Sequence, residues 1–202
     1  AAAQVPDDYE TWKRIVGLYW VTRIPFAMGV RRLHEEQRAV FGLPAAELPV
    51  RGVLVRYEPP RVESVHVADI LNKSTRGVLG IPDPREAELD ALFAAFAPVF
   101  VIDTARDADR PGALGWKDEA APGVEVSTPV VYRRVSHARF GHRVLLQLNY
   151  SLWFPERPLL SESDLLGGRL DGLTWRVTLT PDGEPWVYDS MHNCGCYHQF
   201  FP

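Results

Sequence analysis

The residue types with the most chemistry gather near the end of the sequence, in the heptapeptide His192 to His198. This segment holds both cysteines of the chain and two of its six histidines. Alternate side chains of an extended strand point to the same face. The residues at alternate positions of the heptapeptide are His192, Cys194, Cys196 and His198. The spacing therefore predicts a strand that presents two imidazoles and two thiols on one face.

A metal site is the first interpretation of this cluster, because zinc and copper both bind cysteine sulfur and histidine nitrogen. One strand cannot surround an ion with four ligands, since alternate residues lie about 6.5–7 Å apart along it. His137 and His142, at either end of a predicted hairpin turn, are the expected further donors. The candidate ligands of a zinc or copper ion are His192, Cys194, Cys196, His198, His142 and His137.

Two other interpretations fit the same residues. Cys194 and Cys196 can form a disulfide or a dithiol, and Gly195 lets the backbone bend to close the bridge. Such a bridge would be strained and easily reduced. Alternatively, the cysteines are small buried side chains and the histidines hydrogen-bond to the backbone.

Acidic residues near the cluster are candidate catalytic groups. Glu156 and Asp189 can serve as general acid and base, although a surface ion pair in a proline-stiffened loop is the simpler interpretation of Glu156. Asp189 precedes the cluster and is suited to hold a metal-ligating histidine in one tautomer.

The second half of the chain predicts the antiparallel strands that carry these groups. Alternation of apolar and polar residues indicates strands over 131–139, 142–154, 173–179 and 186–190, with a turn at 181–183. On the strand 142–154 the even positions are apolar and should face the core. Its odd positions include Gln147, Asn149 and Ser151, and we expect this polar face to be solvated. Leu145 and Trp153 on the same face indicate the alternative, that the N-terminal helices or a ligand cover it.

The first half of the chain predicts helices and short strands. Helical periodicity from about residue 8 should end at Pro25, and a second helix over 26–41 should end at Gly42. We further expect strands at 53–57, 65–68 and 99–102, a helix from Pro84 to about Phe96, and a loop over 106–126 anchored by Trp116.

The predicted fold class is α+β: an antiparallel β-sheet from the second half of the chain with N-terminal helices packed against it. We expect a single domain over residues 1–202. Its parts are a helical segment 1–45, a mixed region 46–127 with the long loop 106–126, and the sheet 128–202 that carries the His/Cys cluster.

Composition narrows the classes of partner. The net charge of −4 gives no electrostatic basis for binding nucleic acid. We expect no transmembrane segment, because no apolar run approaches about 20 residues. The sequence begins Ala1-Ala2-Ala3 without methionine, a start typical of a mature exported protein (periplasmic or extracellular) and also of a trimmed sequence. Motifs for nucleotide phosphates, zinc proteases and serine hydrolases are absent.

Several segments of the last third resemble a family of uncharacterised bacterial proteins with a C-terminal Tyr-Asp-Ser-x-His-x-Cys-Gly-Cys-Tyr-His-x-Phe-Phe-Pro motif. The segments are Gln147 to Tyr150, Trp153 to Pro158, Leu170 to Leu179 and Tyr188 to His198. The resemblance covers the chain from about residue 128 to its end and is loose before that. It implies no activity and supports only the importance of the cluster.

These observations lead to two functional hypotheses. The first is a metal-binding protein, with metal-dependent hydrolysis as its candidate reaction. The second is a non-catalytic exported protein, or an accessory subunit of a larger assembly, with a Cys194–Cys196 structural or redox disulfide. In that case the aromatic N-terminal helix and the segment 106–126 would be surfaces for protein partners. The sequence does not indicate the oligomeric state.

Overall fold

The computed structural model describes residues 11–60, 65–78, 80–118, 121–159 and 167–201. The chain divides into two compact units, Ala1–Pro49 and Val50–Pro202. The second unit combines helices with a five-stranded antiparallel sheet, which confirms the predicted α+β class.

The first unit consists of α1 (Thr11–Val16), α2 (Tyr19–Phe41) and the short 3-10 helix η1 (Ala45–Glu47). The break between α1 and α2 lies at Leu18, whose φ of 51° is left-handed. The prediction that Pro25 ends a helix is wrong, because α2 continues through it. A proline removes only one backbone donor from the helix, and α2 has enough other hydrogen bonds to tolerate that loss. The predicted end at Gly42 is confirmed.

None of the helices in the described part of the chain is both long and apolar enough to cross a bilayer.

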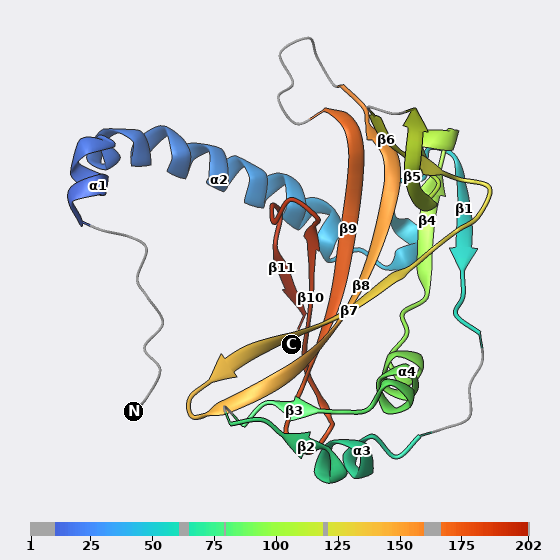
Figure 1. The fold of residues 1–202 in the computed structure, drawn as a ribbon. Helices are drawn as coiled ribbons and strands as arrows, with labels where there is room; N and C mark the ends of the chain where they lie inside the picture. Colours follow the sequence, from blue (N-terminus) through green and yellow to red (C-terminus); the bar gives the residue numbers. More distant parts are fainter. Residues whose placement is uncertain (1–10, 61–64, 79, 119–120, 160–166, 202) are drawn as a thin grey trace. The chain divides into compact units, whose positions relative to one another are not determined.

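The second unit begins with small elements and ends with the sheet (Figure 1). In chain order the small elements are β1 (Val53–Tyr57), α3 (Val67–Lys73), β2 (Thr75–Arg76), β3 (Pro82–Asp83), α4 (Glu86–Ala95), β4 (Phe100–Thr104), the 3-10 helix η2 (Asp107–Asp109), β5 (Ala113–Asp118) and β6 (Ala121–Glu125). The sheet strands are β7 (Tyr132–Phe140), β8 (Arg143–Arg157), β9 (Gly168–Leu179), β10 (Pro185–His192) and β11 (Gln199–Phe201). Their spatial order is β11-β10-β9-β8-β7.

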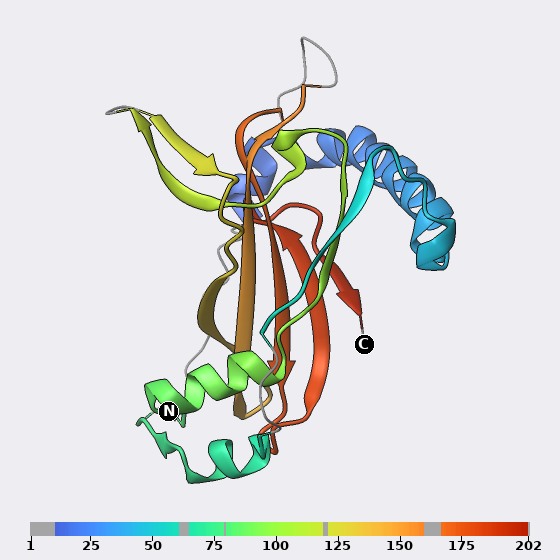
Figure 2. The ribbon, with the colours of Figure 1, turned by 90° about the vertical axis from the view of Figure 1, so that its right-hand side faces the viewer.

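The apolar face of the sheet forms the core of this unit, as the even positions of β8 predict. Figure 2 shows α3 and α4 lying together at one end of the long strands. Their buried side chains pack against those of β8 and β9. The core residues are Leu71, Leu92, Phe93, Leu146, Leu148, Tyr150, Val177 and Leu179.

Two predicted elements of this unit are wrong. Residues 67 and 68 begin α3 rather than a strand, because Val67, Ile70 and Leu71 reach the core at helical spacing. The segment 106–126 is not a loop, since β5 and β6 pair as an antiparallel hairpin. Trp116 of this hairpin is 74% exposed and therefore anchors nothing.

The core makes a direct prediction about stability. Leu148 of β8 is completely buried in the core that the sheet forms with α3 and α4. Leu148→Ala should therefore lower the free energy of unfolding by about 2–5 kcal/mol, through lost burial and the cavity left behind. Leu114→Ala makes the same change at an exposed position of β5 and should cost less than about 1 kcal/mol. Urea unfolding of the two variants tests this; similar losses would mean that Leu148 does not sit in the main core.

Candidate functional site

The heptapeptide that carries the cysteines is a tight turn between β10 and β11. The backbone N–H of Gly195 donates to the His192 carbonyl at 2.7 Å, and the His192 N–H donates to the Cys196 carbonyl at 3.0 Å. Gly195 has a φ of 87°, which glycine adopts without strain. The prediction of one extended strand is therefore wrong, and the four side chains do not share a strand face.

The turn leaves both cysteines free and exposed. The backbone N–H and the thiol of Cys196 hydrogen-bond to the Cys194 sulfur, and this lowers the pKa of Cys194 below that of an ordinary thiol. The same contact raises the pKa of Cys196. The interpretation of the cysteines as small buried side chains is wrong, because both are exposed.

The buried carboxylate of Asp189 holds the C-terminal end of the turn, at His198. Asp189 on β10 is only 1% exposed and receives both arms of the Arg176 guanidinium, Nε at 2.9 Å and Nη2 at 2.8 Å. His198 Nε2 lies 2.9 Å from the same carboxylate. The bidentate geometry and the second partner satisfy a charge that would otherwise be costly to bury.

A second carboxylate–imidazole pair lies at the N-terminal end of the turn, at His192. His192 Nδ1 is 3.3 Å from the Asp171 carboxylate on β9. The His192 ring also packs against Tyr197, with ring centroids 5.1 Å apart, and the guanidinium of Arg157 lies 5.6 Å from the Tyr197 ring. Each histidine of the turn thus has one ring nitrogen beside a carboxylate.

Asn193 fastens the turn to the sheet. Its backbone N–H donates to the Gly172 carbonyl at 2.9 Å, and its side chain donates to the Leu152 carbonyl at 3.0 Å and accepts from Thr174 at 2.6 Å. A Cβ on Gly172 would lie 2.0 Å from the Asn193 amide nitrogen. Glycine at position 172 is therefore what allows this close approach.

The polar face of β8 is not the solvated surface that the sequence suggested. Gln147 and Asn149 are both buried. The Asn149 amide donates to the Ser136 hydroxyl at 2.9 Å and to the Arg134 carbonyl at 2.8 Å. The Gln147 amide donates to Thr178 at 3.0 Å. Hydrogen bonds across three strands satisfy these groups, as buried polar atoms require.

The structure does not bring His137 and His142 to the cysteines. His137 pairs with Leu146 of β8, whereas His192 lies level with Leu152 of the same strand. The six residues between positions 146 and 152 of β8 correspond to about 20 Å. His142 follows the β7–β8 connection, which lies at the opposite end of the sheet from the cysteine turn (Figure 1). Within the described residues, no three His, Cys, Asp or Glu side chains are placed to hold a metal ion.

Glu156 and Asp189 are also apart. Glu156 of β8 is exposed and lies opposite Arg169 in the β8–β9 register. Asp189 lies opposite Arg176 of β9, which in turn lies opposite Asn149 of β8. The seven residues between positions 149 and 156 of β8 span about 23 Å. The two carboxyls therefore do not form one acid–base pair, and Asp189 instead makes the expected contact with an imidazole, that of His198.

Sequence reasoning missed Arg176 as the partner of Asp189, although a signal was present. Both residues lie six positions from the Asp182-Gly183 turn, one on each side. A hairpin closed at that turn sets them opposite each other. The role of Asn193 carried no such signal, because its partners come from β8 and β9.

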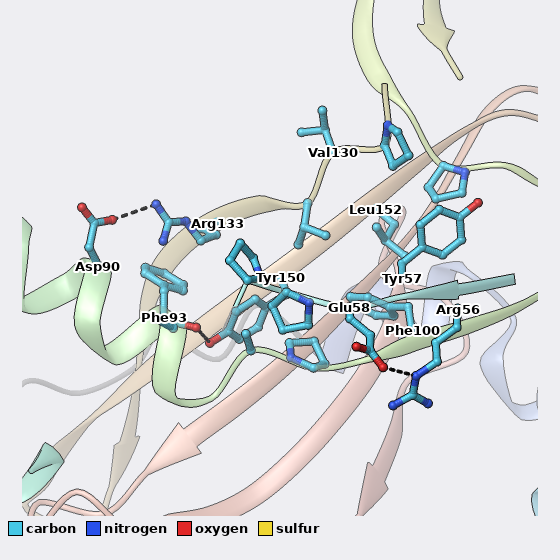
Figure 3. Close-up of a pocket in the computed structure, with 18 residues that line it drawn as sticks. Arg56, Tyr57, Glu58, Asp90, Phe93, Phe100, Val130, Arg133, Tyr150 and Leu152 are labelled. Atoms are coloured by element: carbon cyan, nitrogen blue, oxygen red, sulfur yellow. Dashed lines mark hydrogen bonds and ion pairs between the residues drawn. The ribbon is translucent and has the colours of Figure 1, made fainter. Parts of the chain in front are cut away.

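A cavity of about 860 Å³ lies on the apolar face of the sheet, which carries Tyr150 and Leu152, and extends toward α4 (Figure 3). Tyr57, Phe93, Phe100 and Tyr150 contribute aromatic rings to its lining. Ion pairs stand at its two ends, Arg133 with Asp90 and Arg56 with Glu58. Burial raises the pKa of Tyr150, whose hydroxyl donates to the Phe93 carbonyl at 2.8 Å. This lining suits an apolar molecule and is separate from the polar chemistry of the turn.

No protein-family model, curated protein or solved structure matches this chain. The resemblance noted in the last third of the sequence thus stays a prediction, and the geometry of the turn is the guide to function.

The buried ion pair predicts a measurable dependence of stability on Asp189. Asp189→Asn keeps the shape but leaves the Arg176 guanidinium without its counter-charge, so the free energy of unfolding should fall by about 3 kcal/mol. Asp90→Asn breaks the exposed pair with Arg133 and should cost less than about 1 kcal/mol. Chemical denaturation measures both, and equal losses would show that Asp189 does not organise the hairpin.

Proposed function

We propose that this protein is a thiol–disulfide exchange protein whose reactive group is the Cys194–Cys196 dithiol. The observation that carries the proposal is the pair of free, exposed thiols on either side of Gly195 in one hydrogen-bonded turn. The interaction of Cys194 with Cys196 lowers the pKa of Cys194 and raises that of Cys196. The thiolate is the nucleophile in exchange, and a lowered pKa raises the fraction of thiolate at neutral pH. Cys194 is accordingly the attacking residue and Cys196 the resolving residue.

The proposed reaction reduces a disulfide of a partner. The Cys194 thiolate attacks one sulfur of the partner disulfide, which forms a mixed disulfide and releases the other sulfur as a thiolate. Cys196 then loses its proton to solvent and attacks the Cys194 sulfur, which releases the second partner thiolate and leaves a Cys194–Cys196 disulfide. Two electrons pass from the dithiol to the partner, and the reverse sequence oxidises a partner dithiol.

The surrounding residues support this reaction by holding the turn. Asn193 fixes its first half to β8 and β9, and the Asp189–His198 contact fixes its last residue. Gly195 at the centre is free to change its backbone angles when the ring closes, because no side chain or backbone lies within 4 Å of its Cβ position.

The dithiol predicts a reactivity order that depends on pH. As pH rises from about 5 to 9, iodoacetamide should modify Cys194 at a lower pH than Cys196, because the thiolate of Cys194 forms first. A stoichiometric disulfide oxidant should lower the intact mass by two daltons, located in the Cys194–Cys196 peptide. Mass spectrometry of wild type, Cys194→Ser and Cys196→Ser measures both effects.

The two serine variants make the test decisive. With a model disulfide, Cys196→Ser should trap a mixed disulfide on Cys194, whereas Cys194→Ser should react far more slowly. Equal alkylation profiles for the two cysteines, together with no internal disulfide under oxidant, would reject the proposal.

A metal-binding function is the second candidate, and the two carboxylate–imidazole pairs favour it. A carboxylate beside one ring nitrogen fixes the tautomer and leaves the other nitrogen available as a ligand. His192 with Asp171 and His198 with Asp189 both have this arrangement. With the two thiols beside them, the donor set suits zinc or copper. The turn must change conformation to bring three or more of these donors together.

Metal titration tests this candidate separately from the dithiol. If His192 is a ligand, saturating zinc should raise the free energy of unfolding of the reduced wild type by about 2–3 kcal/mol at a hundredfold excess over Kd, and His192→Ala should lose this response. His34→Ala changes an exposed histidine of α2 and should respond like wild type. An absence of response to zinc and copper in the wild type would reject metal binding and leave the exchange proposal standing.

A further inference from the structure

The helices that the structure describes in the first unit carry an exposed apolar surface. Neither α1 nor α2 buries a single residue. Large apolar side chains in this stretch are between 43% and 73% exposed. They are Trp12, Ile15, Val16, Leu18, Tyr19, Trp20, Val21, Ile24, Phe26 and Met28. Exposed apolar area on this scale marks a binding surface for another molecule.

The apolar residues surround the helix and do not form a single stripe. At 3.6 residues per turn, Tyr19 and Phe26 of α2 lie on the side opposite Val21 and Met28. A groove on a folded protein covers one side of a helix and would leave the apolar side chains on the other side in water. At a bilayer surface, the deeper side chains of a helix enter the acyl boundary, and tryptophan and tyrosine on its shallower side lie among the headgroups, which they favour.

The charge of the segment is strongly one-sided. Residues 11–34 contain five basic residues and no acidic residue, although the whole chain has a net charge of −4. Two basic pairs, Lys13-Arg14 and Arg31-Arg32, flank the apolar stretch 15–30, which contains only Arg23 as a charged residue. Long basic side chains can keep their charge at a membrane surface while their stems lie in apolar surroundings.

Aromatic rings and cations also meet at one end of the segment. Lys13 Nζ lies 5.8 Å from the Trp12 ring centroid, and the Arg14 guanidinium lies 5.9 Å from the Tyr19 ring centroid. Tryptophan and tyrosine favour the boundary between headgroups and acyl chains, because their rings combine an apolar body with a polar atom. The same end thus presents the residues that suit an anionic headgroup layer.

We propose that residues 11–34 attach this protein to the surface of an anionic lipid bilayer. The apolar side chains of α1 and of the first half of α2 enter the acyl boundary, and the flanking basic pairs contact lipid phosphates. This binding surface is independent of the dithiol, so neither proposal depends on the other.

Vesicle flotation of the full chain tests the attachment. The protein should bind phosphatidylcholine vesicles that contain about 30% phosphatidylglycerol and should be released as sodium chloride rises from about 0.05 to 0.5 M. The triple variant Lys13→Glu, Arg23→Glu, Arg31→Glu should reduce the partition coefficient at least about 100-fold, since each cation near an anionic surface contributes about fivefold. The double variant Trp20→Ser, Phe26→Ser should also lose binding.

A matched variant controls for overall charge. Arg51→Glu, Arg143→Glu, Arg169→Glu makes the same charge change at exposed positions of the second unit and should bind like wild type. Far-UV circular dichroism without lipid should show that every variant keeps its secondary structure. Equal binding by the two triple variants, or no binding by the wild type, would overturn the proposal. A dimer in sedimentation equilibrium that Trp20→Ser, Phe26→Ser dissociates, without lipid binding, would assign the surface to a second copy instead.

Discussion

The Asp189 carboxylate is the charge on which the C-terminal hairpin depends. It is almost fully buried on β10, where an unpaired carboxylate would be very costly. Arg176 from β9 supplies two hydrogen bonds and the opposite charge, and His198 approaches from the last residue before β11. One carboxylate therefore joins three consecutive parts of the chain, and the turn that carries the cysteines is held at the point where it returns to the sheet.

The sheet gives this turn a stable base because side chains on both of its faces interact, through apolar packing on one face and hydrogen bonds between strands on the other. On one face, leucines and Tyr150 of β8 meet the helices α3 and α4. On the other face, Gln147 and Asn149 form hydrogen bonds across β7, β8 and β9. Reactive groups are often carried on loops that a stiff scaffold positions. The cysteines follow this pattern, since their exposed turn begins and ends in well-bonded strands.

The two units differ in how their apolar residues are satisfied. In the second unit, apolar side chains of strands and helices cover one another. In the described part of the first unit, α1 and α2 bury no residue. A helix in water gains most of its stability from packing, so the exposed apolar side chains of α1 and α2 are suited to bind another molecule. The cluster of basic residues in this unit favours anionic lipid as that partner.

Periodicity in the sequence determined most of the sheet. The strands at 131–139, 142–154, 173–179 and 186–190 and the helix from residue 86 were predictable, because alternation and helical spacing are local properties that packing then reinforced. Local patterns failed where a tertiary contact decided the outcome. Val67 joined a helix because its neighbours reach the core, and residues 113–118 and 121–125 became strands because they pair with each other.

For the site, composition and order reveal which side chains are available: two thiols, two imidazoles and a neighbouring carboxylate within ten residues, from Asp189 to His198. Their arrangement depends on contacts with other strands. Alternation suggested one strand face, but the left-handed backbone at Gly195 and the contacts of Asn193 with β8 and β9 turned the segment into a loop. Residues distant in sequence, Arg176 and Asp171, supply the charges that hold the two imidazoles, and spacing within a heptapeptide cannot reveal partners that strand pairing brings to it.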